Sequence, residues 1–492
     1  MDFISSAYVE SQQYHFYEED LMLHIEIDKK TKTPLHRQVY HAFRNQILEG
    51  HLKSGNKLPS TRGLSTYLGV SRNVIIESYD QLIAEGFITP REGSGTYVSD
   101  GAFLSSYKKV EQSPKKSIIG LRHEPDESII DFRTGVPNLG LFPIKRWGQI
   151  YKDICDNIDA IDLDYYEPRG RYELRYELSK YLFRSRGVVC SADQIFITTG
   201  AAQAFTLTSR ILLDKDKHVV IEDPINSDIL KIIRSTKATI HSIPVDNQGI
   251  VTDDLPYKID ARYIFTTPSH QYPTGGILSI KRRIALIEYA KKSDGYIVED
   301  DYDSEYRFSG APISSLQSLD PERVIYVGTF SKKLFPALRI GYIVLPKALE
   351  SDFSEAKHLE DLHSPVLEQI TLARFIKSGY LDRHISTTRK FYKEKRERLQ
   401  YALKKTFKDA VFIKGNLTGI HLIAQFKNYQ FSEKVFKKFS VYGIKIHPID
   451  KHTIKKGKYD DTLMLGYGNL SDENIILGVK RMKKAFDTWC KA

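Results

Sequence analysis

The chain has 492 residues, which is too many for one hydrophobic core, so we expect two or more domains. Its 41% hydrophobic and 27% charged residues are typical of globular proteins, and three widely spaced cysteines argue against a disulfide framework or metal site and favour a cytoplasmic compartment. The net charge of +10 is weak grounds for nucleic-acid binding, because residues 21–99 carry 10 Lys+Arg against 7 Asp+Glu, a difference of 3.

The N-terminal part of the chain predicts a short tail followed by a helical unit. Residues 1–20 are polar and acidic and lack the apolar stretch of a signal peptide, and no long apolar run predicts a membrane span. Within residues 21–99, apolar side chains four residues apart predict one face of a first helix: Leu35, Val39, Phe43 and Ile47. Ser60 or Thr61 would cap a short second helix, and Ser71 a third.

The second and third helices are separated by a turn that contains Gly69, which is the arrangement of a helix-turn-helix. Arg72 and Asn73 begin the third helix on the side away from its apolar face, where a recognition helix presents polar groups to DNA bases. Residues 87–98 predict a hairpin wing in which Gly95 lets the backbone approach a phosphate. A small helical protein-interaction domain would fit the same elements, so the pattern alone leaves both interpretations open.

The rest of the chain predicts a linker and a large α/β domain. Residues 100–128 have mixed charge with Ser, Pro and Gly, and they are typical of a linker. Over residues 129–492, short β-branched runs alternate with segments of helix length, which predicts α/β structure with a mainly parallel sheet. The expected strands are 195–199, 219–222, 263–267, 296–300, 324–328 and 340–345.

Side chains at the ends of three expected strands suit pyridoxal 5′-phosphate (PLP). This cofactor needs a lysine for a Schiff base, a carboxylate at the pyridine nitrogen, a donor at the phenolic oxygen, and amides with an arginine at the phosphate. Lys332 and Arg339 follow one strand, and Asp300 and Tyr302 lie at the end of another. A third strand runs into the small residues 200–202, whose amides would face a phosphate at the edge where such sheets bind ligands.

The motifs around these residues resemble two known families. LPSTRGLSTYLGVSRNVIIESYDQLIAEGFITPREGSGTYV resembles the GntR-type winged helix. A resemblance to fold-type-I aminotransferases runs from about residue 131 to 480. It rests on the motifs DYYEPRGRYELR, TTGAAQAF, TPSHQYPTGG, EDDYDSEYR and GTFSKKLFPALRIGY. The whole chain is therefore identified as similar to the MocR/GabR regulators of the GntR superfamily, in which a winged helix is fused to an aminotransferase-like domain.

The resemblance implies a role for each matching residue of the DNA-binding unit. Arg62 and Arg72 would be the main contacts to a double-stranded operator, and Ser71, Asn73 and Gly95 would assist. The family also implies a homodimer in which each DNA-binding unit packs onto the partner chain.

In the larger domain, Lys332 would form the Schiff base, while its neighbour Lys333 is expected to be solvated. Asp300 would pair with the pyridine nitrogen and Tyr302 with the phenolic oxygen, where aminotransferases also use an Asn whose position is Tyr272 here. The remaining implied residues all contact the phosphate, one of them from the neighbouring subunit. They are Thr329, Arg339, the amides of Ala201 and Ala202, and Tyr165 of the partner.

Three positions depart from the aminotransferase pattern. Asn226 stands where an aromatic ring normally stacks on the pyridine, and Met464 where an arginine normally binds the substrate carboxylate. Asp228 stands where some GABA-sensing relatives have an arginine. Methionine cannot form the paired hydrogen bonds that arginine makes with a carboxylate, so we expect impaired transamination of α-amino acids and an effector other than GABA.

Three functions remain open at this point. The first is a PLP-dependent regulator in which an amine effector, or the level of the cofactor itself, changes the geometry of the dimer on DNA. The second is an active aminotransferase that carries a DNA-binding module, which the departures at Asn226 and Met464 disfavour. The third is a regulator that has lost the cofactor and only dimerises, which the presence of Lys332, Asp300 and Arg339 disfavours.

Overall fold

The computed structural model describes residues 12–18, 21–103, 128–415, 417–427, 429–431, 433–436 and 438–489. The chain divides into two compact units, Met1–His123 and Glu124–Ala492. Most of the predicted linker, residues 104–127, lies outside the described residues. Within the described part of the chain, no helix is both long enough and apolar enough to cross a membrane.

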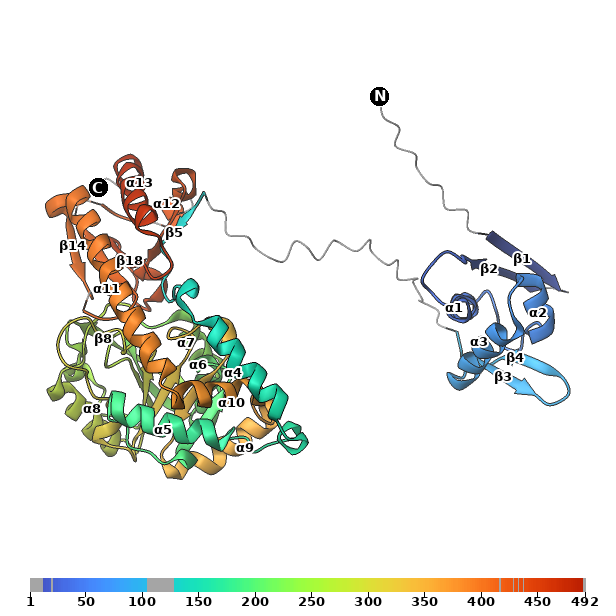
Figure 1. Ribbon diagram of the computed structural model, residues 1–492, viewed down its shortest axis with the longest axis horizontal. Helices are drawn as coiled ribbons and strands as arrows, with labels where there is room; N and C mark the ends of the chain where they lie inside the picture. The colour runs from blue at the N-terminus through green and yellow to red at the C-terminus, as the bar shows by residue number, and fades with distance from the viewer. Residues whose placement is uncertain are drawn as a thin grey trace. The chain divides into compact units, whose positions relative to one another are not determined.

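The N-terminal unit is a three-helix bundle with two small hairpins (Figure 1). Its elements are β1 (Gln12–Glu18), β2 (Leu21–Ile27), α1 (Leu35–Leu48), α2 (Thr61–Leu68), α3 (Arg72–Ala84), β3 (Ile88–Arg91) and β4 (Gly95–Val98). The helices share one apolar core that contains Val39, Phe43 and Ile75. The predicted helix-turn-helix and wing are therefore present as helices α2 and α3 and the β3–β4 hairpin.

The caps and turns of this unit follow from its sequence. Ser60 accepts a hydrogen bond from the Gly63 amide at 3.0 Å and so caps α2, whereas Ser71 precedes α3 without a side-chain cap bond. Gly69 ends α2 with a φ of 61°, a left-handed conformation that suits glycine. The expected tail was wrong over residues 12–18, which form β1 and pair antiparallel with β2. Ile25 and Ile27 of β2 are buried in the core of the helices.

The C-terminal unit is built on an eight-stranded, mainly parallel sheet in the order β6-β13-β12-β11-β10-β7-β8-β9. Its strands are β6 (Ile195–Thr198), β7 (His218–Asp223), β8 (Thr239–Asp246), β9 (Gly249–Ile250), β10 (Ala261–Thr266), β11 (Tyr296–Asp301), β12 (Val324–Thr329) and β13 (Gly341–Val344). β13 runs antiparallel to both of its neighbours, β12 and β6. The α/β architecture predicted from the alternating pattern is confirmed.

Helices cover both faces of this sheet, which explains why its strands are continuous apolar runs. They are α4 (Ile144–Asn157), α5 (Tyr172–Arg186), α6 (Ala201–Leu212), α7 (Ser227–Ser235), α8 (Ile280–Lys292), α9 (Glu350–Asp361) and α10 (Val366–Lys377). In β7, Val219 and Ile221 pack with residues of α6 and α7, whereas Val220 belongs to a separate core with residues of α8. Alternate side chains therefore point into different cores.

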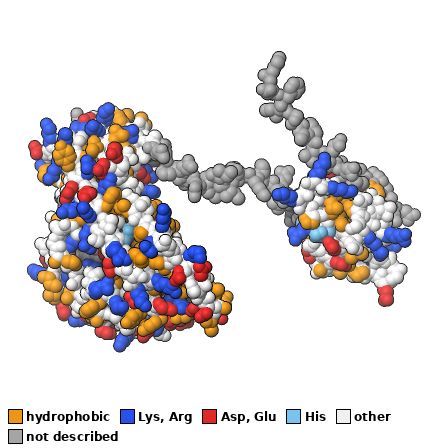
Figure 2. Space-filling view, viewed as in Figure 1, with side chains coloured by type: hydrophobic (Ala, Val, Ile, Leu, Met, Phe, Trp, Pro, Cys, Tyr) orange, Lys and Arg blue, Asp and Glu red, His pale blue; other side chains and the backbone are white. Residues whose placement is uncertain are grey.

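A smaller subdomain completes the unit and contains a four-stranded sheet in the order β14-β15-β18-β17. Its elements are β5 (Ile130–Asp131), α11 (Tyr380–Phe407), β14 (Val411–Lys414), β15 (His421–Phe426), α12 (Glu433–Phe436), β16 (Ile444–Lys445), β17 (His447–Pro448), β18 (Thr462–Gly466) and α13 (Asp472–Trp489). On the visible face of the C-terminal unit, basic and acidic side chains are interspersed (Figure 2). The positive net charge is therefore not gathered into one patch on that face.

Candidate functional site

A cavity of about 350 Å³ lies where strands of the large sheet end. Eight of the nine predicted cofactor residues line it, and they come from segments between residues 201 and 339. The eight are Ala201, Ala202, Tyr272, Asp300, Tyr302, Thr329, Lys332 and Arg339. The ninth, Tyr165, is 80% exposed and does not line the cavity; its ring lies against that of His363, with centroids 6.2 Å apart.

One end of the cavity is shaped for a phosphate group. Helix α6 begins at Ala201, directly after Gly200, whose φ of 123° is a backbone conformation that side chains disfavour. A Cβ atom at Gly200 would lie 2.8 Å from the Arg339 Nη2 atom, so the guanidinium occupies the space that glycine leaves free. A helix N-terminus beside a guanidinium offers aligned amides and a positive charge, the donor set that phosphate requires.

Lys332 supplies the amine of the site. Its Nζ atom donates to the Gly135 carbonyl at 2.6 Å. Burial lowers the pKa of Lys332 below that of an ordinary lysine, and the carboxylates of Asp303 and Asp300 only partly offset this effect. A lowered pKa increases the fraction of uncharged amine, which is the nucleophilic form.

Asp300 lies at the end of β11 and is buried against the cavity. Burial, followed by the charges of Asp301 and Asp303, raises the pKa of its carboxyl well above the usual value. Asp300 makes no hydrogen bond or ion pair with any residue that the structure describes. A buried carboxylate without a partner suits a cationic group in the cavity, such as a protonated pyridine nitrogen.

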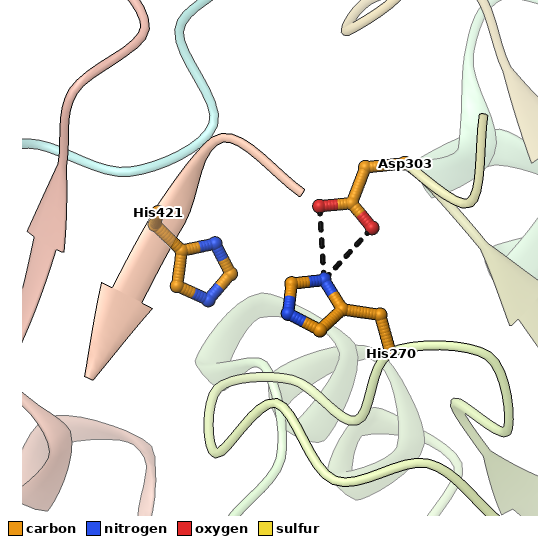
Figure 3. Close-up of side chains that lie close together, drawn as sticks. All are labelled: His270, Asp303 and His421. Carbon is orange, nitrogen blue, oxygen red and sulfur yellow. Dashed lines mark hydrogen bonds and ion pairs between the residues drawn. The ribbon is translucent and has the colours of Figure 1, made fainter. Parts of the chain in front are cut away.

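Tyr302 also contacts a cluster that sequence reasoning missed. Its hydroxyl lies 3.0 Å from both the Nδ1 atom and the carbonyl oxygen of His270. His270 in turn bonds to Asp303, and His421 packs beside it (Figure 3). His270 and Asp303 belong to the motifs TPSHQYPTGG and EDDYDSEYR, so the sequence marks both as close to the site. It does not indicate that they pair, because they lie 33 residues apart in the chain.

The positions that depart from the aminotransferase pattern have structural roles. Asn226 caps α7 by accepting a hydrogen bond from the Asp228 amide at 2.9 Å. Met464 is buried in a small apolar cluster with Ile423 and Ile449 and does not line the cavity. Asp228 lines the cavity entrance and pairs with an exposed lysine on its own helix. No arginine other than Arg339 lines the described cavity.

The prediction for Lys333 was wrong, because this side chain is fully buried. Its Nζ atom forms an ion pair with Glu305, whose side chain is 4% exposed, and lies 3.3 Å from the Tyr342 hydroxyl. This pair raises the pKa of Lys333, against the opposing effect of burial. The sequence conceals the pairing because Glu305 lies on a different segment of the chain.

The predicted DNA contacts are all exposed on the N-terminal unit. Ser71, Arg72 and Asn73 are exposed at the start of α3, and Arg62 is exposed at the start of α2. The Arg72 Nε atom donates to the Thr61 hydroxyl at 3.2 Å, which orients the guanidinium without burying it. The wing residue Gly95 is also exposed, with a φ of 120°.

Comparison with known proteins assigns a family to each unit. Residues 35–98 match the gntR family of bacterial regulatory proteins, and residues 128–453 match aminotransferase class I and II. The crystal structure of Pyrococcus horikoshii kynurenine aminotransferase in complex with PMP aligns with a TM-score of 0.69. It is 29% identical, and the alignment covers 75% of this chain and 93% of that enzyme. The protein therefore joins a gntR-type winged helix to an aminotransferase fold.

Two relatives narrow the assignment further. The probable rhizopine catabolism regulatory protein MocR of Rhizobium meliloti is 32% identical over 471 residues, which are 94% of this chain and 95% of MocR. The pyridoxine biosynthesis transcriptional regulator PdxR of Corynebacterium glutamicum is 31% identical over 381 residues, 77% of this chain and 81% of PdxR. The chain belongs to the MocR/GabR subfamily of HTH-type transcriptional regulators.

Proposed function

We propose that this protein is a transcription regulator that holds PLP in the C-terminal cavity, responds to a small amine, and binds an operator through its winged helix. The cavity is the observation that supports PLP as the cofactor, because groups complementary to each part of PLP meet there. They include Arg339 beside a helix N-terminus, the unpartnered carboxylate of Asp300 and the amine of Lys332. Family membership supports the regulatory role, since MocR and PdxR are named as regulators.

Each group would then have a defined task. Bound PLP supplies an aldehyde that condenses with amines and a ring that withdraws electrons. Arg339, Thr329 and the α6 amides of Ala201 and Ala202 would hold the phosphate. Asp300 would keep a proton on the pyridine nitrogen, because its carboxylate forms no ion pair with a described residue, although Lys332 and Arg339 also line the cavity.

The remaining contacts would complete the cofactor site and imply a dimer. Tyr302 and Tyr272 would face the phenolic oxygen from one wall of the cavity. Lys332 would bond covalently to the cofactor, in keeping with its lowered pKa. Tyr165 would reach the phosphate of a partner subunit, which fits its 80% exposure and its distance from the cavity of its own chain. The regulator would accordingly act as a homodimer.

On DNA, Arg62 and Arg72 would make the main contacts, with Ser71, Asn73 and Gly95 beside them. All five are exposed on one unit, and arginine is suited to guanine edges and phosphates. Two such units in a dimer would bind paired half-sites. An amine that enters the cavity and favours one dimer arrangement would change the spacing of the two units, and so the affinity for the operator.

We propose that the effector is an amine whose binding does not require an arginine to pair with a carboxylate group. Met464 offers only apolar packing, and Arg339 is reserved for the phosphate. Steady aminotransferase turnover with α-amino acids is not expected for the same reason. Sustained conversion of an amino acid and a keto acid at rates of about 1 per second or more would contradict this part of the proposal.

The cofactor assignment is tested by the visible absorbance of the purified protein. The wild type should show a yellow band, Lys332→Ala should lose or shift it, and Lys347→Ala, which alters an exposed lysine, should keep it. If the wild type has no band even after PLP is added, the protein does not bind the cofactor. If Lys332→Ala keeps the wild-type band, another group holds it.

A further inference from the structure

Two imidazoles and a carboxylate form a buried group, shown in Figure 3, that lies at the wall of the cavity. His270 follows β10, Asp303 follows β11 and His421 begins β15, so three segments distant in sequence meet here. Their exposures are 2%, 1% and 1%. Asp303 and His421 line the cavity, while His270 lies against Tyr302, with ring centroids 5.7 Å apart. The proposed function gives this group no task.

The hydrogen bonds decide which nitrogen of His270 carries a hydrogen. Nδ1 lies 2.9 Å and 3.0 Å from the two carboxylate oxygens of Asp303. Burial raises the pKa of the Asp303 carboxyl, and the charge and hydrogen bond of His270 act against this effect. In its ionised form the carboxylate only accepts hydrogen bonds, so Nδ1 is the donor. Nε2 is then an unprotonated nitrogen, and it is buried without a hydrogen-bond partner in the described chain. Asp303 therefore selects the tautomer of His270.

This tautomer determines what the Tyr302 hydroxyl can do. The hydroxyl oxygen lies 3.0 Å from Nδ1, close enough to accept from the Nδ1 hydrogen, which Asp303 shares. The hydroxyl hydrogen is then not needed by the imidazole; it is donated to the His270 carbonyl oxygen at 3.0 Å, and rotation about the C–O bond can redirect it to a group in the cavity. If His270 were protonated on Nε2 instead, Nδ1 would accept the tyrosine hydrogen and remove that donor from the cavity.

We propose that Asp303 and His270 are positioning residues that act through Tyr302, keeping its hydroxyl available as a donor to the phenolic oxygen of the cofactor. This inference rests on the proposed function. By stabilising the ionised phenolic oxygen, the group would set the pH range in which the cofactor site is competent to bind amines. The chemistry matches other sites where a buried carboxylate fixes the tautomer of a histidine that contacts the reacting group.

Several of the titratable groups around His270, Asp303 and Tyr302 are themselves paired or neutral, and Lys332 and Arg339 are the basic side chains that line the described cavity. Asp301 pairs with Arg186 at 2.7 Å, and Glu305 pairs with Lys333. Burial and the neighbouring His270 lower the pKa of His421 to about 3, so this ring is neutral near pH 7. The titratable groups that face Asp303, His270 or Tyr302 are Asp300, Asp301, Glu305, Lys332, Tyr272, Tyr306, Tyr467 and His421.

A metal ion is the alternative occupant, since one ligand atom from each of His270, Asp303 and His421 lies within 4.8 Å of the others. The hydrogen bonds favour the proton network, because Asp303 already bonds to His270. His421 Nε2 also lies 3.3 Å from the Pro273 carbonyl oxygen, which suits an N–H donor rather than a bare metal ligand.

The test is a pH titration of the visible band of PLP-loaded, full-length protein. Asp303→Asn should raise the pH midpoint of the band by about one unit, a tenfold change in the protonation equilibrium. Asp131→Asn is the matched control, since Asp131 bonds to His447 at 2.8 Å in the same unit but away from the cavity, and it should leave the midpoint unchanged. His270→Gln gives a second route to the same shift if Asp303→Asn does not fold.

A double-variant comparison separates positioning from a general structural effect. In a Tyr302→Phe background, Asp303→Asn should no longer move the midpoint, because the group acts through the tyrosine hydroxyl. An unchanged midpoint in the single variant, or the same shift without the hydroxyl, would overturn the proposal. So would a shift on adding Zn²⁺ to the wild type that His421→Gln abolishes. A wild type without any band would instead refute the cofactor assignment itself.

Discussion

Lys333 and Glu305 form an ion pair inside the C-terminal unit, with side chains that are 0% and 4% exposed. Lys333→Met keeps most of the side-chain volume and its contacts with the rings of Phe330 and Tyr181, but it removes the charge. Glu305 would then be a buried carboxylate without a cation, with the Tyr181 hydroxyl at 2.9 Å as its remaining donor. Breaking a buried pair in this way costs about 3–5 kcal/mol of folding free energy.

The adjacent lysine is a matched control for this prediction. Lys332→Met removes a hydrogen bond to the Gly135 carbonyl and the attraction to Asp303 and Asp300, but it also removes a burial penalty that outweighs this attraction, so its cost should be only about 1 kcal/mol. The double variant Lys333→Met/Glu305→Gln removes both charges and leaves an acceptor for Tyr181. It should be more stable than Lys333→Met alone, since no unpaired charge remains buried.

Urea unfolding of the cofactor-free variants measures these differences without a contribution from cofactor binding. The two tryptophans, Trp147 and Trp489, both belong to the C-terminal unit, so their fluorescence reports on that unit alone. Equal losses of stability in Lys332→Met and Lys333→Met would refute the reasoning. A double variant no more stable than Lys333→Met would show that the cost does not come from the uncompensated Glu305.

Three further predictions concern DNA, cofactor and pH. Arg72→Ala should weaken operator binding in a gel shift by about 1–3 kcal/mol, roughly 5- to 150-fold, with unchanged circular dichroism. Gly200→Ala would place a Cβ atom 2.8 Å from Arg339 Nη2, so PLP affinity measured by equilibrium dialysis should fall by about tenfold or more. Burial lowers the pKa of His452 to about 4, so its stabilising contribution is complete above pH 6.5 and falls as the pH drops towards 4. Between pH 7 and pH 5 the wild type should lose about 2 kcal/mol more stability than His452→Gln, and parallel stability curves would contradict this.

The local patterns of the sequence predicted the architecture, and together with the family resemblance they predicted eight of the residues that line the cavity. Strands buried on both faces read as continuous apolar runs, and the glycine-rich turn before α6 and the lysine after β12 follow directly from them. The failures involve pairings between distant segments. Lys333 looked like a surface lysine because its partner lies on another segment, and β1 looked like a tail because only its pairing with β2 makes it a strand. A single sequence gives no signal that two positions far apart in the chain are in contact.

The same limit applies to His270. This residue lies within the motif TPSHQYPTGG, but the sequence alone assigns it no chemical role. Its tautomer depends on Asp303, and its contact with Tyr302 depends on how the loop after β10 folds against the end of β11. Neither relation has a spacing signature, because both are set by the packing of parallel strands rather than by helix or strand periodicity. The residues that line the cavity were easier to find, because most of them lie at or soon after the end of a strand, such as Asp300 at β11 and Lys332 after β12.

Compared with the aminotransferase pattern, this chain keeps the residues suited to PLP and lacks the arginine suited to a substrate carboxylate. The groups suited to PLP line the cavity, and they include Arg339, Asp300 and Lys332. The position of the carboxylate-binding arginine is instead filled by Met464, which packs into an apolar cluster and cannot bind an anion. Cofactor binding and substrate-carboxylate binding are therefore separable in this fold. A site that condenses with amines but does not orient an α-amino acid for turnover can respond to amine concentration without consuming the amine, which is what a sensor requires.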